Sequence, residues 1–306
     1  MKDLTQFNQS LFCSAELIEG LQNHLLSLSV FNIAIAISTI VGNTLILIAL
    51  RKGTSLHPPS TVLRGSLAAS DLCIGFMELL YVTYLLSLTH ERSQICRHIV
   101  PVRSIAITIS FAVSLLTTTA ISVDRLLALL LGLRYRQVVT LKRVYAVVIA
   151  IWVYPSVGFS LWFYSHFLWK LFAASNIILC LIIAIYCYSR IFRRLRRHQT
   201  QVRGNVQEEA IQTIPLNITR YRKSVFMAMW VQLVLVLCYL PYTFVAPFAF
   251  QNIQTNVERS SASFLALQTT VTLIFLNSSL NPILYFCKIK EMRRAVKDTL
   301  RQLCCS

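Results

Sequence analysis

The sequence predicts an all-α membrane protein, a bundle of seven transmembrane helices. Of its 306 residues, 56% are hydrophobic and only 13% are charged, and the mean hydropathy is +0.61. Soluble globular domains carry about 25% charged residues, so this composition is typical of a chain embedded in lipid. A helix needs about 20 apolar residues to cross a bilayer. Seven runs meet that length: 25–50, 60–88, 99–131, 144–164, 168–192, 224–250 and 262–286.

These runs divide the chain into three parts. Residues 1–24 form an N-terminal tail, residues 25–287 form the seven-helix domain, and residues 288–306 form a short amphipathic eighth helix with a cytoplasmic tail. The net charge of +17 first suggests nucleic acid, but most Lys and Arg residues lie in alternate loops and the C-terminal tail. The positive-inside rule therefore predicts a multi-pass plasma-membrane protein with its N-terminus outside. Its basic loops face anionic lipid or a cytosolic partner, and no nucleic acid is expected.

Each of the predicted helices carries a short polar, aromatic or proline-containing motif. In chain order these are GN at 42–43, LAASD at 67–71, DRL at 124–126 with LRY at 133–135, Trp152, YSR at 188–190, CYLP at 238–241 and NPILY at 281–285. Together they resemble the motifs of rhodopsin-like (class A) G-protein-coupled receptors over nearly the whole chain. The resemblance implies that an extracellular ligand is converted into activation of a heterotrimeric G protein.

The resemblance also implies a polar site at the middle of the membrane. Asp71 is the acid of this site. An unpaired carboxylate inside a bilayer costs much free energy, so polar side chains are expected to partner it. By resemblance, a sodium ion bound at Asp71 shares this site in the inactive state; a water-mediated structural network without an ion is the alternative. No other cofactor is expected. The residues of this network are Asn43, Asp71, Ser114, Asn277, Ser278 and Asn281.

A second set of residues is implied to switch the receptor and contact the G protein. Arg125 pairs with Asp124 in the inactive state and turns to the G protein when the sixth helix moves outward. Pro241 and Pro282 break the helical hydrogen-bond ladder and allow the helices to bend. The remaining members of the set are Leu133, which inserts into the G protein, and Tyr188, Tyr239 and Tyr285. Arrestin is a further partner that the resemblance implies.

Several positions depart from the family pattern. Tyr221 stands where many relatives have an acid that holds the arginine, so raised basal activity is expected. Cys96 lies about four residues before the usual cysteine of the third helix, and the connection around residues 165–170 is short and has no cysteine. This short connection resembles that of melanocortin receptors and their neighbours, the adenosine and cannabinoid receptors.

Three covalent modifications are expected. Asn8 lies in a glycosylation sequon on the outer side. Cys13 and Cys96 are the outer cysteines, and either form a bridge to the top of the third helix or remain free thiols. Cys304 and Cys305, in the tail, are candidates for palmitoylation.

The ligand pocket is expected between the outer halves of the helices. Ile107 occupies the position of the amine-binding acid, and Phe275 occupies the retinal-linkage position, so neither a biogenic amine nor retinal is expected. Glu78 lies two helical turns beyond Asp71 and either anchors a cationic ligand or pairs with Arg103. Helical phase adds the other lining residues: Thr108, Phe111, Tyr242, Thr243 and Gln268.

Other classes of protein fit the sequence less well. A transporter would show internal repeats and paired charges within its spans, and neither is visible. The six His residues show no metal-ligand spacing, and no nucleophile–base set is present, so the chain is not expected to be an enzyme. A receptor-like scaffold that no longer couples to a G protein remains the alternative.

Overall fold

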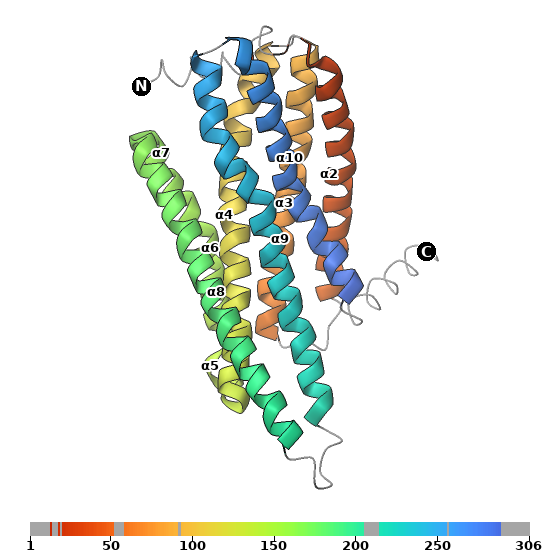
Figure 1. Cartoon of the computed structure of the whole chain (residues 1–306), viewed down its shortest axis with the longest axis vertical. Coiled ribbons are helices and arrows are strands. Elements are labelled where there is room, and N and C mark those ends of the chain that lie inside the picture. Colours follow the sequence, from red (N-terminus) through yellow and green to blue (C-terminus); the bar gives the residue numbers. More distant parts are fainter. Residues whose placement is uncertain are drawn as a thin grey trace, which may run out of the picture. The chain divides into compact units, whose positions relative to one another are not determined.

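The computed structural model describes residues 13, 18, 20–51, 58–90, 93–204, 214–255 and 257–288. Within these ranges it is helical and contains no strand, which confirms the predicted fold class. The seven helices that are long and apolar enough to cross a membrane are α2 (Gln22–Arg51), α3 (Pro58–Thr89), α4 (Ser93–Leu131), α6 (Leu141–Phe159), α8 (His166–Gly204), α9 (Ile214–Thr255) and α10 (Val257–Lys288) (Figure 1).

Three short helical elements join these long helices. Gly132 adopts φ +51, a conformation that favours glycine, and ends α4. The chain then forms the 3-10 turn η2 (Gly132–Arg134) and the short helix α5 (Tyr135–Val138) before α6 begins. Helix α7 (Leu161–Tyr164) follows α6 after Ser160.

The connection between the fourth and fifth spans was predicted around residues 165–170, and this position was wrong. Ser165 is extended, with φ −158 and ψ 123, and α8 begins directly after it at His166. The Ser165 hydroxyl accepts a hydrogen bond from the Leu168 amide at 3.4 Å, as a serine that caps a helix N-terminus does. The chain therefore turns between α6 and α8 through α7 and Ser165. Hydropathy did not separate these elements because all of them are apolar.

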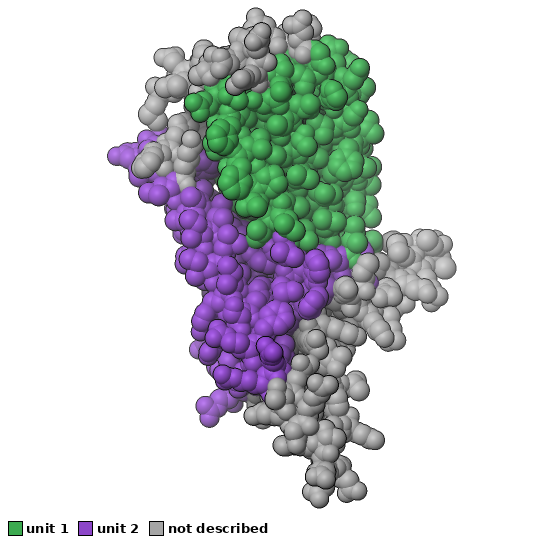
Figure 2. Space-filling model, viewed as in Figure 1, with its two compact units in different colours: residues 1–48, 68–111, 234–283 green, residues 49–67, 112–233, 284–306 purple. Residues whose placement is uncertain are grey.

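The chain divides into two compact units, each described here by itself (Figure 2). Unit 1 comprises residues 1–48, 68–111 and 234–283, and unit 2 comprises residues 49–67, 112–233 and 284–306. Among the described residues, the core of unit 1 has a large apolar cluster that includes Tyr81, Phe264 and Phe275, all fully buried, and a small one around Ala249. Unit 2 has two smaller clusters, one around Ile191 and the other around Leu67.

Large apolar side chains also cover the outer surface of the helices. Val30, Ile185 and Phe248 are each more than 60% exposed. Continuous exposure of this kind is unfavourable in water and matches the hydrocarbon of a bilayer. The seven helices and their apolar surface are those of a multi-pass membrane protein.

Candidate functional site

Asp71, on α3, is the centre of a buried polar site in unit 1. Its side chain is fully buried, and its Oδ2 accepts a hydrogen bond from Asn281 Nδ2 of α10 at 2.7 Å. The Ser278 hydroxyl also neighbours this carboxylate, although it makes no hydrogen bond of its own within the described chain. A buried carboxylate with a single neutral donor remains poorly compensated.

Pro282 explains why Asn43 belongs to this site. A proline has no backbone N–H, so the carbonyl four residues earlier loses its helical partner. That carbonyl is Ser278 O, and Asn43 Nδ2 of α2 donates to it at 3.3 Å. Asn43 Nδ2 also donates to Thr39 O at 2.9 Å. The side chain of one helix thus replaces a backbone donor missing from another, as membrane helices require.

Gly42 allows α2 and α10 to approach closely enough for this contact. A Cβ atom added at Gly42 would lie 2.7 Å from both Cβ and Cγ of Pro282. Real Cβ atoms essentially never come this close to another heavy atom, so glycine is required by packing at this position.

The site contains more acceptor oxygens than donors. Five buried oxygens of the expected network in unit 1 have no hydrogen-bond partner within the described chain: Asn43 Oδ1, Asp71 Oδ1, Asn277 Oδ1, Ser278 Oγ and Asn281 Oδ1. Carboxylate, amide and hydroxyl oxygens are the ligands of hard cations and also accept hydrogen bonds from water. The oxygens of Asp71 and of its neighbours Ser278 and Asn281 therefore suit a sodium ion or ordered waters. Among the described residues, no group of three or more His, Cys, Asp or Glu side chains could hold a metal.

Ser114, on α4, belongs to unit 2. Its side chain is fully buried, and its hydroxyl has no hydrogen-bond partner within the described ranges. Its own unit therefore leaves this hydroxyl available to a ligand or to water.

Asp124 and Arg125 form a second polar cluster, in unit 2. Arg125 Nη2 contacts Asp124 Oδ2 in an ion pair and also donates to Ser60 Oγ of α3. Ser60 Oγ donates to Asp124 Oδ2 at 3.0 Å, and the Tyr135 hydroxyl of α5 donates to Asp124 Oδ1 at 2.5 Å. The carboxylate thus has three donors, one of them charged.

Tyr135 is suited to remain a donor in this cluster. Burial, followed by its hydrogen bond to the Asp124 carboxylate, raises the pKa of Tyr135 to about 12. Both effects disfavour the phenolate, because it would be an unsolvated anion beside another anion. The hydroxyl therefore stays protonated over the whole physiological range.

The other switch residues occupy helices of both units. Tyr188 of α8 is buried, and its hydroxyl is hydrogen-bonded to Ser122 Oγ at 2.7 Å. Tyr285 is also buried in unit 2. In unit 1, Tyr239 of α9 stacks on Phe111 of α4, with ring centroids 3.6 Å apart. Pro241 lies inside α9 beside Tyr239.

Glu78 is the most unusual residue of the expected ligand pocket. It is fully buried, and neither carboxylate oxygen has a hydrogen-bond partner in the described part of unit 1. Arg103 lies in α4, but its side chain is outside the described part of the structure, so the expected pair remains a prediction. Ile107, Thr108 and Tyr242 are half-buried.

Tyr81 contacts two residues of the expected pocket, and the sequence reasoning missed it. Its hydroxyl donates to Gln268 of α10, to the backbone oxygen at 3.0 Å and to Oε1 at 3.1 Å. Its ring lies 5.2 Å from that of Phe275. The available signal was its position three residues after Glu78, on nearly the same face of α3.

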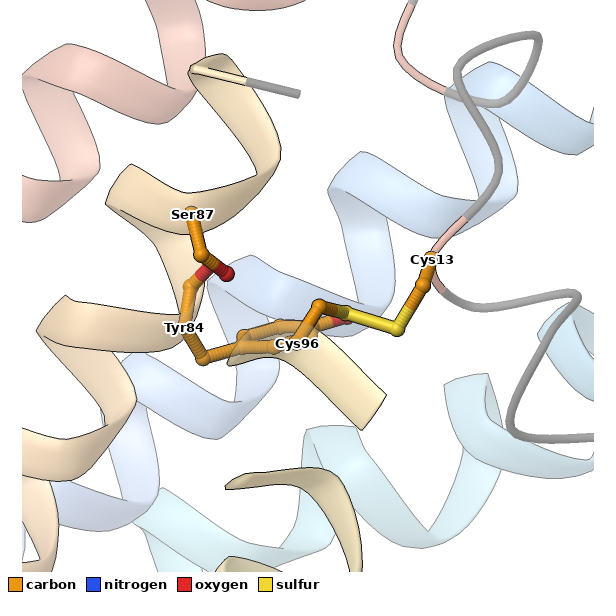
Figure 3. Close-up of a disulfide and its surroundings, with 4 residues drawn as sticks. All are labelled: Cys13, Tyr84, Ser87 and Cys96. Carbon is orange, nitrogen blue, oxygen red and sulfur yellow. A yellow bond between two sulfur atoms is a disulfide. The ribbon is translucent and has the colours of Figure 1, made fainter. Parts of the chain in front are cut away.

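A disulfide joins Cys13 to Cys96, in the first turn of α4 (Figure 3). The Cα atoms are 6.0 Å apart, within the usual range for such a bond. The Tyr84 side chain extends toward the bond, and Ser87 Oγ donates to the Tyr84 carbonyl at 2.7 Å. Of the two alternatives left open for these cysteines, the structure has the bridge.

Five other expected features are not described structurally. Asn8, Cys304, Cys305 and the amphipathic segment after Lys288 lie outside the described residues. Leu133 lies in η2, but its side chain is outside the described part.

The seven helices, the buried acid opposite a proline-broken helix and the Asp–Arg cluster together define a membrane receptor. The family model for the 7 transmembrane receptor (rhodopsin family) matches residues 42–180 and 160–285. The chain therefore belongs to the rhodopsin family of receptors, which confirms the resemblance, and it is a receptor of the plasma membrane rather than an enzyme.

Three curated relatives are melanocortin receptors. The chain is 26% identical over 320 residues to melanocortin receptor 5 of Mus musculus, covering 99% of this chain and 94% of that receptor. It is 25% identical over 284 residues to melanocortin receptor 5 of Rattus norvegicus, covering 89% of this chain and 83% of the relative. The receptor of the same name from Ovis aries is 25% identical over 274 residues, with 87% and 82% covered.

Proposed function

We propose that this receptor converts the binding of an extracellular ligand into activation of a heterotrimeric G protein, with raised basal activity. The observation that carries the proposal is the cluster around Arg125. The guanidinium is 11% exposed and is held by a buried carboxylate on the neighbouring residue. Such a contact is stable while intact and costly once broken. It is therefore an element with two discrete arrangements, which a switch requires.

The surroundings of Asp124 reduce the cost of releasing Arg125. When the guanidinium leaves, the carboxylate keeps the Ser60 and Tyr135 hydroxyls as donors. Hydrogen bonds to the charged form stabilise a buried carboxylate. The freed Arg125 then offers a forked donor to carbonyl and carboxylate groups of the G protein.

The test is activation of each G-protein class in cells without added ligand. We expect basal activation through one class, lost in Arg125→Ala and strongly reduced in Leu133→Asp at equal surface expression. Arg136→Ala is the matched control, because Arg136 is an exposed arginine of α5 and should leave activation unchanged. Silence of the wild-type chain in every class would favour the non-coupling scaffold and count against raised basal activity.

We propose that the oxygen site around Asp71 binds a sodium ion in the arginine-paired state. Asp71, Asn43, Ser278 and Asn281 supply the ligands, and their unpartnered oxygens support the proposal. The ion would supply the positive charge that the single Asn281 amide does not. The alternative occupant is ordered water.

We propose that the N-terminus lies outside and the C-terminus in the cytoplasm. Disulfides form in oxidising compartments, so the Cys13–Cys96 bond favours the outer side for both residues. This orientation makes Asn8 a glycosylation site and Cys304 and Cys305 palmitoylation sites on the lipid-facing inner side. A mass shift on glycosidase treatment, lost in Asn8→Gln, tests the outer half of the proposal. Arrestin and anionic lipids are proposed partners of the inner side.

The ligand is proposed to be a peptide or small molecule with a cationic group that reaches Glu78. The relatives are named melanocortin receptors, so melanocortins are the first ligands to screen. A buried carboxylate without a described partner requires a positive charge or a proton. Glu78→Gln should lower responses to cationic members of a synthetic peptide library and leave responses to neutral members unchanged. Equal loss of both would favour a structural pair with Arg103.

A further inference from the structure

The described residues of the N-terminal segment, Cys13, Ile18, Gly20 and Leu21, place two apolar side chains in the core of unit 1. Cys13 is held by the bond to Cys96, and Ile18 and Leu21 are only 6% and 7% exposed. The apolar cluster that contains Ile18 and Leu21 also contains Tyr84, Phe264 and Phe275. Ile18 and Leu21 therefore belong to an apolar cluster that side chains of α3 and α10 also form.

A defined turn orients the two apolar side chains of this segment. The Leu21 amide donates to Ile18 O at 2.8 Å, and the Leu25 amide donates to Leu21 O at 2.9 Å. Gly20, between them, has φ +75, which other residues rarely adopt. No atom lies within 4 Å of a Cβ built on Gly20, so backbone conformation alone requires the glycine. The turn directs Ile18 and Leu21 into the same cluster.

The same cluster includes residues of the expected ligand pocket. Phe275 is a buried member of the cluster. Ile107 and Cys13 are partly buried and pack against the cluster. Ile18, Leu21 and these expected pocket residues are therefore part of one apolar cluster. A ligand that reaches these residues from outside meets the side chains of the segment.

The disulfide makes binding of the segment an intramolecular event. Cys13 is fixed on α4 and residue 22 begins α2, so the segment between them is attached at both ends. A tethered group binds at the high effective concentration that its short linker imposes. Displacement by a free ligand must overcome this advantage.

We propose that Cys13, Ile18 and Leu21 act as a built-in ligand of the unit 1 cluster that contains Phe275, and that they stabilise the form in which Arg125 is paired with Asp124. The buried Ile18 and Leu21 side chains and the Arg125–Asp124 pair occur together in this structure. A group bound to one state shifts the population toward that state. Release of the segment therefore raises signalling. This inference rests on the proposed G-protein coupling.

The experiment measures basal G-protein activation per receptor at the cell surface. The variants are Ile18→Asp, which keeps the disulfide, and Cys13→Ser/Cys96→Ser, which removes it. Each should raise basal activation severalfold, since burial of one Ile side chain shifts an equilibrium by roughly tenfold or more. The combined variant should add little, because both changes disrupt the same contact.

Two controls separate this role from a purely structural one. Ile18→Val keeps the apolar contact and should behave as wild type. Cys73→Ser removes a cysteine of α3 that is outside any disulfide and should also leave activation unchanged. A segment that only stabilised the fold would, when altered, lower activation per surface receptor, and that result would overturn the proposal.

Hydrogen exchange on the purified full chain in lipid nanodiscs provides a readout that needs no G protein. Ile18→Asp should speed exchange of the amides near Phe264 at least threefold, and unchanged exchange would overturn the proposal. Arg125-dependent basal activity that does not respond to Ile18→Asp would refute the built-in ligand alone. A third outcome is faster exchange in Ile18→Asp while no variant activates any G-protein class. That outcome would refute the proposed coupling and also the proposal that the segment favours one state.

Discussion

Asp71 and Asp124 are both buried carboxylates on membrane helices, but their partners differ in number and kind. Asp124 accepts hydrogen bonds from a guanidinium, a serine hydroxyl and a tyrosine hydroxyl. Within the described residues, Asp71 accepts one hydrogen bond, from the neutral amide of Asn281. The oxygens of Asn43, Asn277 and Ser278 in the same unit lack donors within the described chain. Asp124 thus belongs to a contact that the protein completes by itself, whereas the described chain leaves the contact at Asp71 incomplete.

Removing the two carboxylates should have unequal effects on stability, and this is the largest difference we expect. Asp124→Ala leaves a partly buried guanidinium without its counter-ion and should cost about 3–5 kcal/mol. Asp71→Ala removes one neutral hydrogen bond and should cost about 1–2 kcal/mol. Thermal unfolding of both variants in the same detergent measures the difference.

The corresponding asparagine variants are the controls for this comparison. Asp71→Asn keeps an acceptor for Asn281 and should approach wild-type stability without added salt. Asp124→Asn keeps the shape but loses the charge and should remain clearly destabilised. Equal losses at the two positions would contradict the distinction between a completed and an incomplete contact.

The close approach of α2 and α10 should be sensitive to a single methyl group. Gly42→Ala places a Cβ against Pro282 and should cost about 1–3 kcal/mol through overpacking. Gly65→Ala is the matched control on α3, because nothing lies within 4 Å of its Cβ. Alanine there should be neutral or stabilise by up to about 1 kcal/mol. Thermal midpoints of the two variants measure this, and similar values would argue against the close packing.

Sodium should stabilise the receptor only through the incomplete site. At a sodium concentration ten times the dissociation constant, the gain should be about 1.4 kcal/mol. The measurement compares thermal midpoints in sodium chloride and in choline chloride at equal ionic strength. Asp71→Asn should abolish the difference and Asp124→Asn should retain it. A wild-type receptor indifferent to the cation would favour a site filled by water.

The smallest expected effect is the loss of one donor from the completed contact. Tyr135→Phe should cost about 1 kcal/mol, because Asp124 keeps two other donors. The folded-state pKa of Tyr135 is about 12, above the ordinary value of 10. Its contribution is therefore fully present below about pH 10 and lost as the pH rises through about 12.

The difference in stability between Tyr135→Phe and wild type should thus be constant from pH 6 to 9. Tyr145→Phe, at an exposed position of α6, is the control and should show no loss. A difference that changes with pH below 9 would mean that another group titrates in this cluster.

The seven helices and Asp71 could be predicted because hydropathy and motif order depend only on residue type and sequence position. The need for a donor at Ser278 O could also be inferred, since Pro282 removes the donor four residues later. That Asn43 supplies this donor could not be predicted, because the contact depends on the angle and separation of two helices. Tyr135 belongs to the LRY motif, but the sequence predicts no role for it. The turn at Gly132 that brings Tyr135 to Asp124 is a feature of the backbone.

The Cys13–Cys96 bond has a consequence for biosynthesis. Both cysteines precede every residue of α6, α8, α9 and α10 in the order of synthesis. Once the helix beginning at Ser93 has entered the membrane, the ribosome has already delivered everything the bond requires. The cross-link can therefore close a ring of chain around α2 and α3 while the remaining spans are still untranslated. A nascent chain truncated after α4 should therefore already show the faster gel mobility of an oxidised loop.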